Sequence, residues 1–337
     1  MISLLKKLLY KHCWHYRFLA DKKADYIEFN NGYDSSPYPK QPGNDVIMMF
    51  SGRVSLWAFD LHGGLADRLK GIVSVYKACI EANRTFKILH TIPYKLEDYL
   101  EPNEIDWRIK EDEIQYNRNA VHPHYLRHAH YKDEEKYLMW RLIKLLKSEK
   151  GIHHIYSNAK MINDEEYRDL FHKLFKPSPV IQSHITNNLQ NINNIYISLS
   201  FRFCHLLGDP IDEYMPELNQ NDKISLLNKT YNSIIDFHQS YPNHTILINS
   251  DSATFIDYIK KKELNYVHII PGIPIHIDQV KVNELNTIDS YIKTFVDFFM
   301  ISKAEKVFLV KSTEMRNSGF PKVASIIGNK PFQIHHI

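Results

Sequence analysis

Hydrophobic positions follow two different spacings along the chain, and their alternation predicts strands followed by helices. Short apolar runs between turn residues favour strands, whereas apolar residues three or four positions apart favour amphipathic helices. In the first half, strands are predicted at 46–50 and 86–90, and helices at 65–83, 135–149 and 165–176. Residues 97–135 are polar, acidic and rich in His, and we expect surface loops and short helices there.

The second half of the chain has a more regular order of strands and helices. Strands are predicted at 194–201, 245–249, 266–270 and 306–310, and helices at 224–241, 253–262, 287–302 and 319–327. Strands that alternate with helices predict a parallel, doubly wound sheet. The segment 182–194 is rich in Asn and Gln, and we expect an interdomain helix or linker there. The predicted fold class is therefore α/β, with an acceptor-side domain at 1–185 and a nucleotide-sugar domain at 190–337.

Composition narrows the possible functions. The chain has 337 residues, which is enough for about two domains with cores of their own. Its formal net charge is +3, with both signs mixed along the sequence, so a nucleic-acid footprint is not expected. The 3 cysteines are widely spaced and odd in number, which argues against a disulfide scaffold or a Cys-rich metal site. This pattern favours a reducing compartment, and we expect a cytoplasmic protein.

The N-terminal segment 1–20 combines Lys and Arg with apolar residues and has no acidic residue. A basic amphipathic segment of this kind can lie on the inner face of an anionic membrane. The alternative is a helix packed on the body of the protein, which we favour. Apolar runs fall well short of the roughly 20 residues needed to span a bilayer.

Two adjacent glycines, Gly63 and Gly64, precede the predicted helix at 65–83. Paired glycines allow a tight turn and a close approach of the backbone to a ligand. The first turn of the following helix offers unpaired N–H groups, which suit an anion or a sugar hydroxyl. The alternative is an ordinary turn between a strand and a helix.

The ends of the predicted strands in the second half carry polar residues, and parallel sheets bind ligands at these ends. Arg202 suits a diphosphate because guanidinium forms a two-pronged hydrogen bond with phosphate oxygens; the alternative is a pair with a nearby carboxylate. Asp251, which follows Ser250, suits a nucleobase amine or a ribose hydroxyl; the alternative is a helix N-cap. Ser318 and Gly319 open the last helix and present N–H groups to phosphate, or they simply cap the helix.

Taken in this order, the motifs resemble the metal-independent fucosyltransferases of the GT-B type, which include α-1,2- and α-1,6-fucosyltransferases and protein O-fucosyltransferases. Residues 63–69, GGLADRL, are similar to the Gly-Gly-Leu-Gly-(Asn/Asp)-Arg-Leu element of that group. The family has His-x-Arg-x-x-Asp after the first strand of the nucleotide domain. Here Ser200 stands at the His position, Arg202 matches, and the acid is displaced to Asp209. Ser250-Asp251 matches a later Ser/Thr-Asp element, and residues 318–320 match a Ser-x-Phe element.

The resemblance implies a GT-B fold with two Rossmann-like domains that face a central cleft. It implies inverting transfer of fucose from GDP-fucose to a glycan acceptor, in the synthesis of a surface polysaccharide or glycoconjugate. No metal and no cofactor are expected, because an arginine and helix N-termini take the place of a metal. The GDP-sugar and the glycan are the expected binding partners.

The resemblance also implies roles for individual residues. Arg202 holds the β-phosphate, with support from the backbone at the start of the last helix, and Asp251 reads the guanosine. Gly63, Gly64 and Arg68 are expected to line the cleft between the domains. The remaining substrate-binding residues are Ser200, Ser250, Ser318, Gly319 and Phe320.

The acceptor hydroxyl needs a general base, and three side chains are candidates. Asp209 is slightly favoured because it follows the strand of Arg202, and Asp67 and His62 are the others. Each has an alternative: Asp67 can pair with Lys70 or Lys110, His62 can bond to a loop carbonyl, and Asp209 can begin a turn before a proline.

Two further segments have open interpretations. The Pro/Gly-rich segment 270–278 either folds over the nucleotide, with His276 and Asp278 at its edge, or forms a structural turn. The segment 122–132 is rich in His and Tyr and suits an acceptor-binding aromatic surface better than a metal site. The adjacent pairs His153-His154 and His335-His336 are expected to face apart on a strand or helix.

Two other functions are consistent with the sequence. Ser200 at the His position favours a noncatalytic module that binds glycans or nucleotides. The basic segment 1–20 favours a component of a membrane-surface assembly. High Asn, Lys and Ile contents with few glycines point to an AT-rich bacterial genome.

Overall fold

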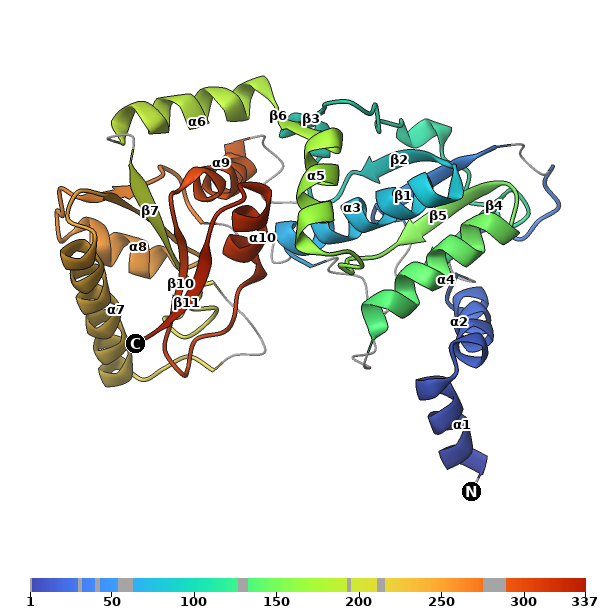
Figure 1. Cartoon of the computed structure of the whole chain (residues 1–337), viewed down its shortest axis with the longest axis horizontal. Helices are drawn as coiled ribbons and strands as arrows, with labels where there is room; N and C mark the ends of the chain where they lie inside the picture. The colour runs from blue at the N-terminus through green and yellow to red at the C-terminus, as the bar shows by residue number, and fades with distance from the viewer. Residues whose placement is uncertain are drawn as a thin grey trace. The chain divides into compact units, whose positions relative to one another are not determined.

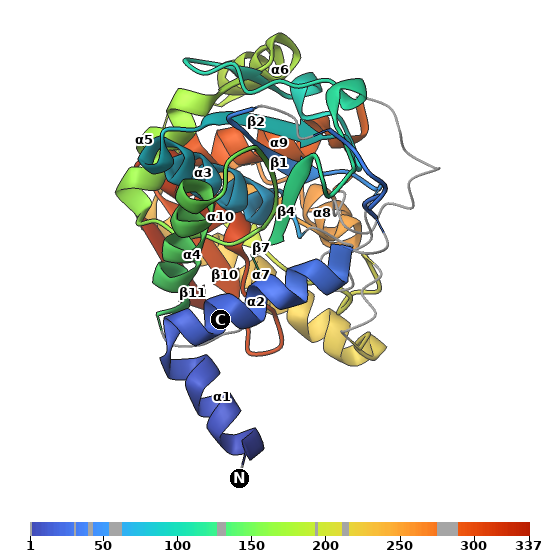
Figure 2. The same ribbon diagram turned by 90° about the vertical axis from the view of Figure 1, so that its right-hand side faces the viewer.

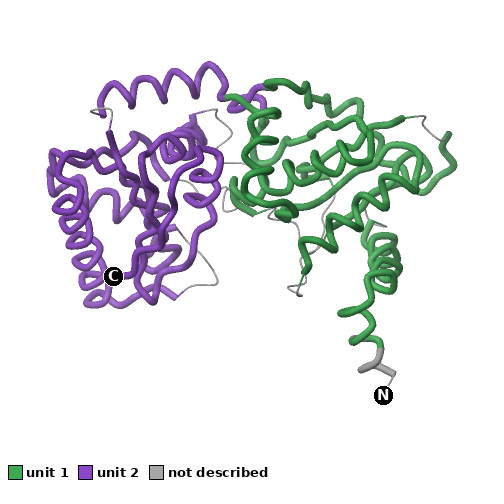
Figure 3. The backbone as a smooth tube through the Cα atoms, in the orientation of Figure 1, with its two compact units in different colours: residues 1–96, 102–176 green, residues 97–101, 177–337 purple. Residues whose placement is uncertain are grey.

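The computed structural model describes residues 2–29, 32–39, 43–53, 63–126, 133–192, 195–210, 216–274 and 289–337. The chain divides into two compact units (Figure 3). Unit 1 comprises residues 1–96 and 102–176, and unit 2 comprises residues 97–101 and 177–337. The long part of unit 2 therefore begins at residue 177, a little before the domain boundary of 185–190 expected from the sequence.

Unit 1 is built on a parallel sheet of four strands in the order β2-β1-β5-β4 (Figure 1). The strands are β1 (Asp45–Phe50), β2 (Thr85–His90), β4 (Val121–Tyr125) and β5 (Ile152–Tyr156). Helix α3 (Leu65–Ala82) packs against α4 (Glu134–Ser148) and α5 (Asp164–Leu174). Nearly every residue of β1 is buried, as expected for a strand in the middle of a helix-covered parallel sheet.

Unit 2 is built on a parallel sheet of five strands in the order β11-β10-β7-β8-β9. These are β7 (Tyr196–Phe201), β8 (Thr245–Ser250), β9 (Val267–Ile269), β10 (Val307–Lys311) and β11 (Phe332–His336). The helices are α6 (Pro179–Asn191), α7 (Gln220–Ser240), α8 (Ala253–Lys260), α9 (Asp289–Lys303) and α10 (Gly319–Ile327). Helices α7 and α8 share one apolar core with the strands, while α9 packs against α6 and α10 (Figure 1).

The small strands β3 (Leu100–Pro102) and β6 (Phe175–Pro177) pair with each other where the chain changes units. Within unit 2, the ring of Tyr99 stacks on Phe295 of α9, with 4.6 Å between centroids and 4° between planes. The short segment 97–101 is therefore anchored in the core of unit 2 by a stacked aromatic pair.

Most elements match the patterns in the sequence, and the α/β class is confirmed. The final helix begins at Gly319 and ends at Ile327, as predicted. The prediction for 97–135 was wrong in part, because β4 lies within it, and β5 and β11 had not been predicted. All three strands carry histidine in place of a continuous apolar run, and two of them are edge strands.

The N-terminal segment forms α1 (Ile2–His12) and α2 (Trp14–Glu28), and α2 packs on unit 1. The Trp14 ring meets Tyr137 of α4 edge-on at 5.8 Å, and the buried Arg17 guanidinium donates to Glu134 Oε1 at 2.7 Å. Figures 1 and 2 show α1 projecting beyond α2. The packed-helix interpretation therefore holds for α2. Among the described residues, no helix combines the length and apolar character that crossing a membrane requires.

Gly71 allows α3 to lie directly against the loop that follows β5. A Cβ atom at this position would stand 2.2 Å from the carbonyl oxygen of Ser157. Alanine normally stabilises a helix interior by about 0.5–1 kcal/mol relative to glycine. Here the contact is with backbone, which cannot move aside cheaply, so the overlap outweighs the gain in helix propensity.

We predict that Gly71→Ala lowers the free energy of unfolding of unit 1 by about 1–3 kcal/mol, the usual cost of overpacking. Urea unfolding followed by far-UV circular dichroism measures this loss. Gly52→Ala is the matched control, because its methyl group meets only the movable end of Ile92 at 2.2 Å. Equal unfolding midpoints for the two variants would contradict the close-approach argument.

Candidate functional site

The loops that follow β7, β8 and β10 share the carboxyl edge of the unit 2 sheet. Strand β7 pairs in parallel with β8 on one side and with β10 on the other. The sequence motifs at 200–209, 250–252 and 312–320 therefore leave the sheet at the same edge, which is where parallel sheets bind ligands. This common edge is the candidate functional site.

Arg202 is held at the end of β7 by Asp251, which follows β8. Arg202 Nε lies 3.3 Å from Asp251 Oδ2, and the two side chains are 26% and 9% exposed. The ion pair proposed as the alternative for Arg202 is therefore present. Because part of the arginine side chain reaches solvent, the pair fixes its direction without burying it.

Asp251 also binds the backbone of the β7 loop. Its Oδ1 accepts a hydrogen bond from Phe203 N and its Oδ2 accepts one from Cys204 N, both at 2.9 Å. Burial raises the pKa of the Asp251 carboxyl, and Arg202 and the two amides oppose that shift. The carboxylate predicted to read guanosine is thus engaged within the protein, where it shapes the loop of Arg202.

Asp209 connects the loop after β7 to the start of α8, whereas Asp251 connects the loop after β8 to the loop after β7. Asp209 lies in the loop after β7, and its Oδ1 accepts a hydrogen bond from Ser252 Oγ at 2.8 Å. Its Oδ2 accepts one from Thr254 N in the first turn of α8, at 2.9 Å. Ser252 is itself the N-cap of α8 and accepts from Phe255 N. Asp209 therefore supports a helix N-terminus, where a carboxylate is favoured.

The two carboxylates thus form a reciprocal clamp between the β7 and β8 loops, and the β7 loop adopts an unusual backbone to fit it. Cys204 has φ +53° and Gly208 has φ +92°. A positive φ is costly for a side chain other than Gly, Asn or Asp, and it persists where surrounding bonds enforce it. The bond from Cys204 N to Asp251 is one such bond.

Two of the serines predicted to bind substrate, Ser200 and Ser250, lie within strands β7 and β8. Ser200 is 3% exposed, and its Oγ has no hydrogen-bond partner among the described residues. In β7 it stands between Asn249 of β8 and Leu309 of β10. Ser250 is buried, and its Oγ accepts from Ser252 N at 3.1 Å. Position 200 thus offers a small buried hydroxyl within the strand that leads to Arg202.

The N-terminus of α10 follows β10 at the same edge. Ser318 is the N-cap, and its Oγ accepts from Phe320 N at 3.3 Å. The Phe320 ring packs on Phe298 of α9, with centroids 5.5 Å apart. Capping, the alternative for Ser318, is therefore observed, and Gly319 is the first residue of the helix.

The glycine turn belongs to unit 1, where Arg68 supports it from within. Gly63 has φ +70°, and Gly64 is the N-cap residue of α3. The Arg68 guanidinium is 2% exposed and donates to Gly63 O at 2.9 Å and to Ile92 O at 2.7 Å. These donors fix the glycine turn to the segment after β2.

Asp67 lies on the exposed side of the same helix turn. Its side chain is 47% exposed, and Oδ1 accepts from Lys70 Nζ at 2.8 Å. The pairing with Lys70, one of the alternatives considered for Asp67, is therefore present. An exposed carboxylate whose partner among the described residues is one lysine keeps acceptor capacity for a further hydrogen bond.

Several predicted residues lie outside the described part of the chain. His62, His276 and Asp278 are among them. Residues 127–132 of the His- and Tyr-rich segment 122–132 also lie outside the described part. The described start of the 270–278 segment is tied to α9, since the buried Lys293 Nζ donates to Ile270 O at 3.0 Å. Gly272 has φ +117°, so this start is a turn that requires glycine.

Sequence reasoning missed both the clamp and a group of side chains in unit 1. The sequence could have indicated the clamp, because Asp209 and Asp251 each follow one of two predicted strands, and acidic residues after adjacent strands can reach each other's loops. The unit 1 group contains His124, Glu149 and His153, whose ligand atoms lie within 4.8 Å of one another. It was missed because β4 and β5 had not been predicted.

No family model matches this sequence, and no curated protein sequence matches it. Solved structures match it in fold. The NodZ α-1,6-fucosyltransferase of Bradyrhizobium, solved after soaking with GDP-fucose, is 13% identical, with a TM-score of 0.53 over 85% of this chain and 93% of that chain. A mutant of Arabidopsis thaliana FUT1 in complex with GDP is 11% identical, with a TM-score of 0.50 over 96% of this chain and 79% of that chain. The fold is therefore that of GT-B fucosyltransferases, as the sequence motifs predicted.

We predict that Asp251→Asn lowers the free energy of unfolding of unit 2 by about 1–3 kcal/mol, because an amide nitrogen would face a backbone N–H. The measurement is urea unfolding at neutral pH. Asp257→Asn, on the exposed side of α8, is the matched control. The clamp would be refuted as a stabilising element by the same midpoint in both variants.

Proposed function

We propose that this chain is a glycosyltransferase that transfers fucose from GDP-fucose to a glycan acceptor. The observation that carries the proposal is Arg202, directed by Asp251 at the carboxyl edge of the unit 2 sheet. The N-terminus of α10 lies at the same edge. The likeness in fold to NodZ soaked with GDP-fucose supports the choice of donor.

In the proposed reaction, the bond between the fucose anomeric carbon and the β-phosphate oxygen breaks, and GDP leaves with that electron pair. The acceptor oxygen forms the new bond from the opposite face of the sugar, and its proton passes to a general base. Negative charge therefore builds on the β-phosphate. Arg202 and the N–H groups that open α10 are proposed to stabilise that charge, a contribution that is usually large in enzymes.

Asp251 and Asp209 are proposed as positioning residues for this step. Asp251 gives the arginine a fixed direction, so little reorganisation is needed when the diphosphate binds. Asp209 holds the first turn of α8 and thereby the loop that carries Asp251. Both oxygens of Asp209 already accept hydrogen bonds, so of the two described candidates for the proton-accepting role we now prefer Asp67, whose side chain pairs with Lys70.

A second candidate function is donor binding without transfer. The buried Ser200 hydroxyl favours it, because it replaces the histidine that precedes the arginine in related motifs. A noncatalytic protein would bind GDP-fucose and release no GDP from it. The two functions therefore separate in one experiment that measures both binding and GDP release.

We predict that the chain binds GDP and GDP-fucose in the presence of excess EDTA, at least about tenfold more tightly than UDP-glucose, a difference of 1.4 kcal/mol. Isothermal titration calorimetry of the full chain measures the affinity for each of the three ligands. Binding that needs Mn²⁺ would point to another class of glycosyltransferase. Failure to bind any guanosine diphosphate compound would refute the proposed donor site.

Arg202→Ala should reduce GDP release from GDP-fucose by about 10²-fold or more, the typical effect of removing one donor to a developing anion. Arg202→Lys should recover only part of the rate, because lysine keeps the charge but loses the two-pronged geometry. Initial rates at saturating donor provide the test. The control is Arg108→Ala in unit 1, where the arginine is 57% exposed and pairs with Asp106. A rate in Arg202→Ala equal to that of this control would exclude Arg202 from the reaction.

A further inference from the structure

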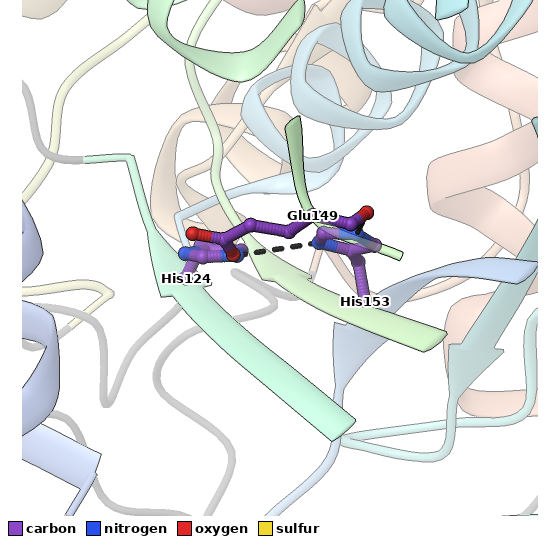
Figure 4. A group of neighbouring side chains, drawn as sticks. All are labelled: His124, Glu149 and His153. Carbon is purple, nitrogen blue, oxygen red and sulfur yellow. Dashed lines mark hydrogen bonds and ion pairs between the residues drawn. The ribbon is translucent and has the colours of Figure 1, made fainter. Parts of the chain in front are cut away.

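Three potential ligand atoms converge in unit 1, on the elements that surround the end of α4 (Figure 4). His124 lies on β4, His153 lies on the neighbouring parallel strand β5, and Glu149 is the C-cap residue of α4. His124 Nε2 lies 3.3 Å from His153 Nδ1 and 3.5 Å from Glu149 Oε2. The two imidazoles are 5% and 0% exposed, so the group is largely shielded from water.

The outer nitrogen of each imidazole faces an acceptor. His153 Nε2 lies 3.1 Å from the backbone oxygen of Glu149, so the proton of a neutral ring belongs on Nε2. His124 Nδ1 lies 3.5 Å from Asp25 Oδ2, which places its proton on Nδ1. Two neutral rings in these tautomers direct the lone pairs of Nε2 and Nδ1 at each other across 3.3 Å. Such an arrangement is unfavourable unless a cation or a proton lies between the lone pairs.

Two of the spacings among these atoms match the coordination shell of a small divalent metal, and all three atoms lie within 4.8 Å of one another. Zinc binds imidazole nitrogen and carboxylate oxygen at about 2.0–2.2 Å with tetrahedral geometry, which separates neighbouring ligand atoms by roughly 3.3–3.6 Å. The two distances at His124 Nε2, 3.3 and 3.5 Å, fall within this range. We therefore propose that His124, His153 and Glu149 bind a divalent transition-metal ion of the zinc class.

The surroundings of the group resemble those of known metal ligands. Histidine ligands commonly donate their second N–H to a carboxylate or a backbone carbonyl, which fixes the ring and raises its basicity. Here Asp25 serves His124, and the Glu149 carbonyl serves His153. Asp25 is itself held by Arg141, whose Nη2 lies 2.6 Å from Asp25 Oδ2. Glu149 pairs through Oε1 with Lys22 and directs Oε2 at His124.

A fourth ligand can come from His122 or from water. His122 Nδ1 lies 3.7 Å from Glu149 Oε2, and its side chain is 41% exposed. The site is composed entirely of unit 1 residues, and none of them belongs to the candidate donor site. Its role is therefore structural: the ion joins β4, β5 and the end of α4.

The competing arrangement has no metal. In it, His124 is protonated on both nitrogens and donates to Asp25 and to Glu149, which are 3.5 Å away on either side. This arrangement also resolves the facing lone pairs, so metal binding itself must be measured.

The test is a titration of the tag-free full chain with Co²⁺ after removal of bound metal with a chelator. Tetrahedral Co²⁺ has visible absorption bands that octahedral Co²⁺ in water lacks, so the spectrum reports both binding and geometry. We expect saturation at one equivalent per chain, displacement of the bands by Zn²⁺, and a Zn²⁺-dependent rise of several degrees in the melting temperature, since binding to the native state stabilises it.

His153→Gln should lose the bands and the thermal shift, while His184→Gln, an exposed histidine on α6, should keep both. Asp25→Asn should keep the stoichiometry but weaken binding by about 10–100-fold, as is usual when the partner of a histidine ligand is removed. Absence of saturable Co²⁺ or Zn²⁺ binding to the wild-type chain would overturn the proposal and leave the protonated His124 arrangement. Equal binding by His153→Gln and His184→Gln would also overturn it.

Discussion

The carboxyl edge of the unit 2 sheet depends on two aspartates that each bind the other's loop. Asp251, after β8, accepts from two backbone amides of the β7 loop, and Asp209, in the β7 loop, accepts from the first turn of α8. A carboxylate can only accept, and these backbone donors need acceptors when they leave the sheet. The Asp251 carboxylate that satisfies the backbone amides therefore also fixes the direction of Arg202, through a separate ion pair with its Nε. An arginine on a free loop would have no such fixed direction.

Much of the fold could be read from the sequence because most of its central strands carry apolar residues in short runs or in alternation. β7, β8 and β10 were predicted for this reason, and their order placed Arg202, Asp251 and Ser318 at one edge. The edge strands β4 and β11 escaped prediction because histidines and other polar residues interrupt their apolar pattern. Spacing along the sequence also cannot show which way a buried side chain turns, and Arg68 turned inward to hold Gly63.

The candidate donor site of Arg202 and the proposed metal site lie in different units. Unit 2 holds fixed positive charge and a helix N-terminus, which suit a diphosphate. Unit 1 holds the His124, Glu149 and His153 group, whose softer ligands suit a transition metal. Because these groups share no residue, removal of a metal should affect the folding of unit 1 and leave recognition of GDP to unit 2.

A crystal structure of the chain with GDP tests the central claim most directly. We predict that the β-phosphate lies within hydrogen-bonding distance of the Arg202 guanidinium and close to the backbone N–H groups at the start of α10, with Asp251 still bound to Phe203 N and Cys204 N. A diphosphate bound elsewhere, or an Arg202 side chain that turns away from the bound nucleotide, would contradict it.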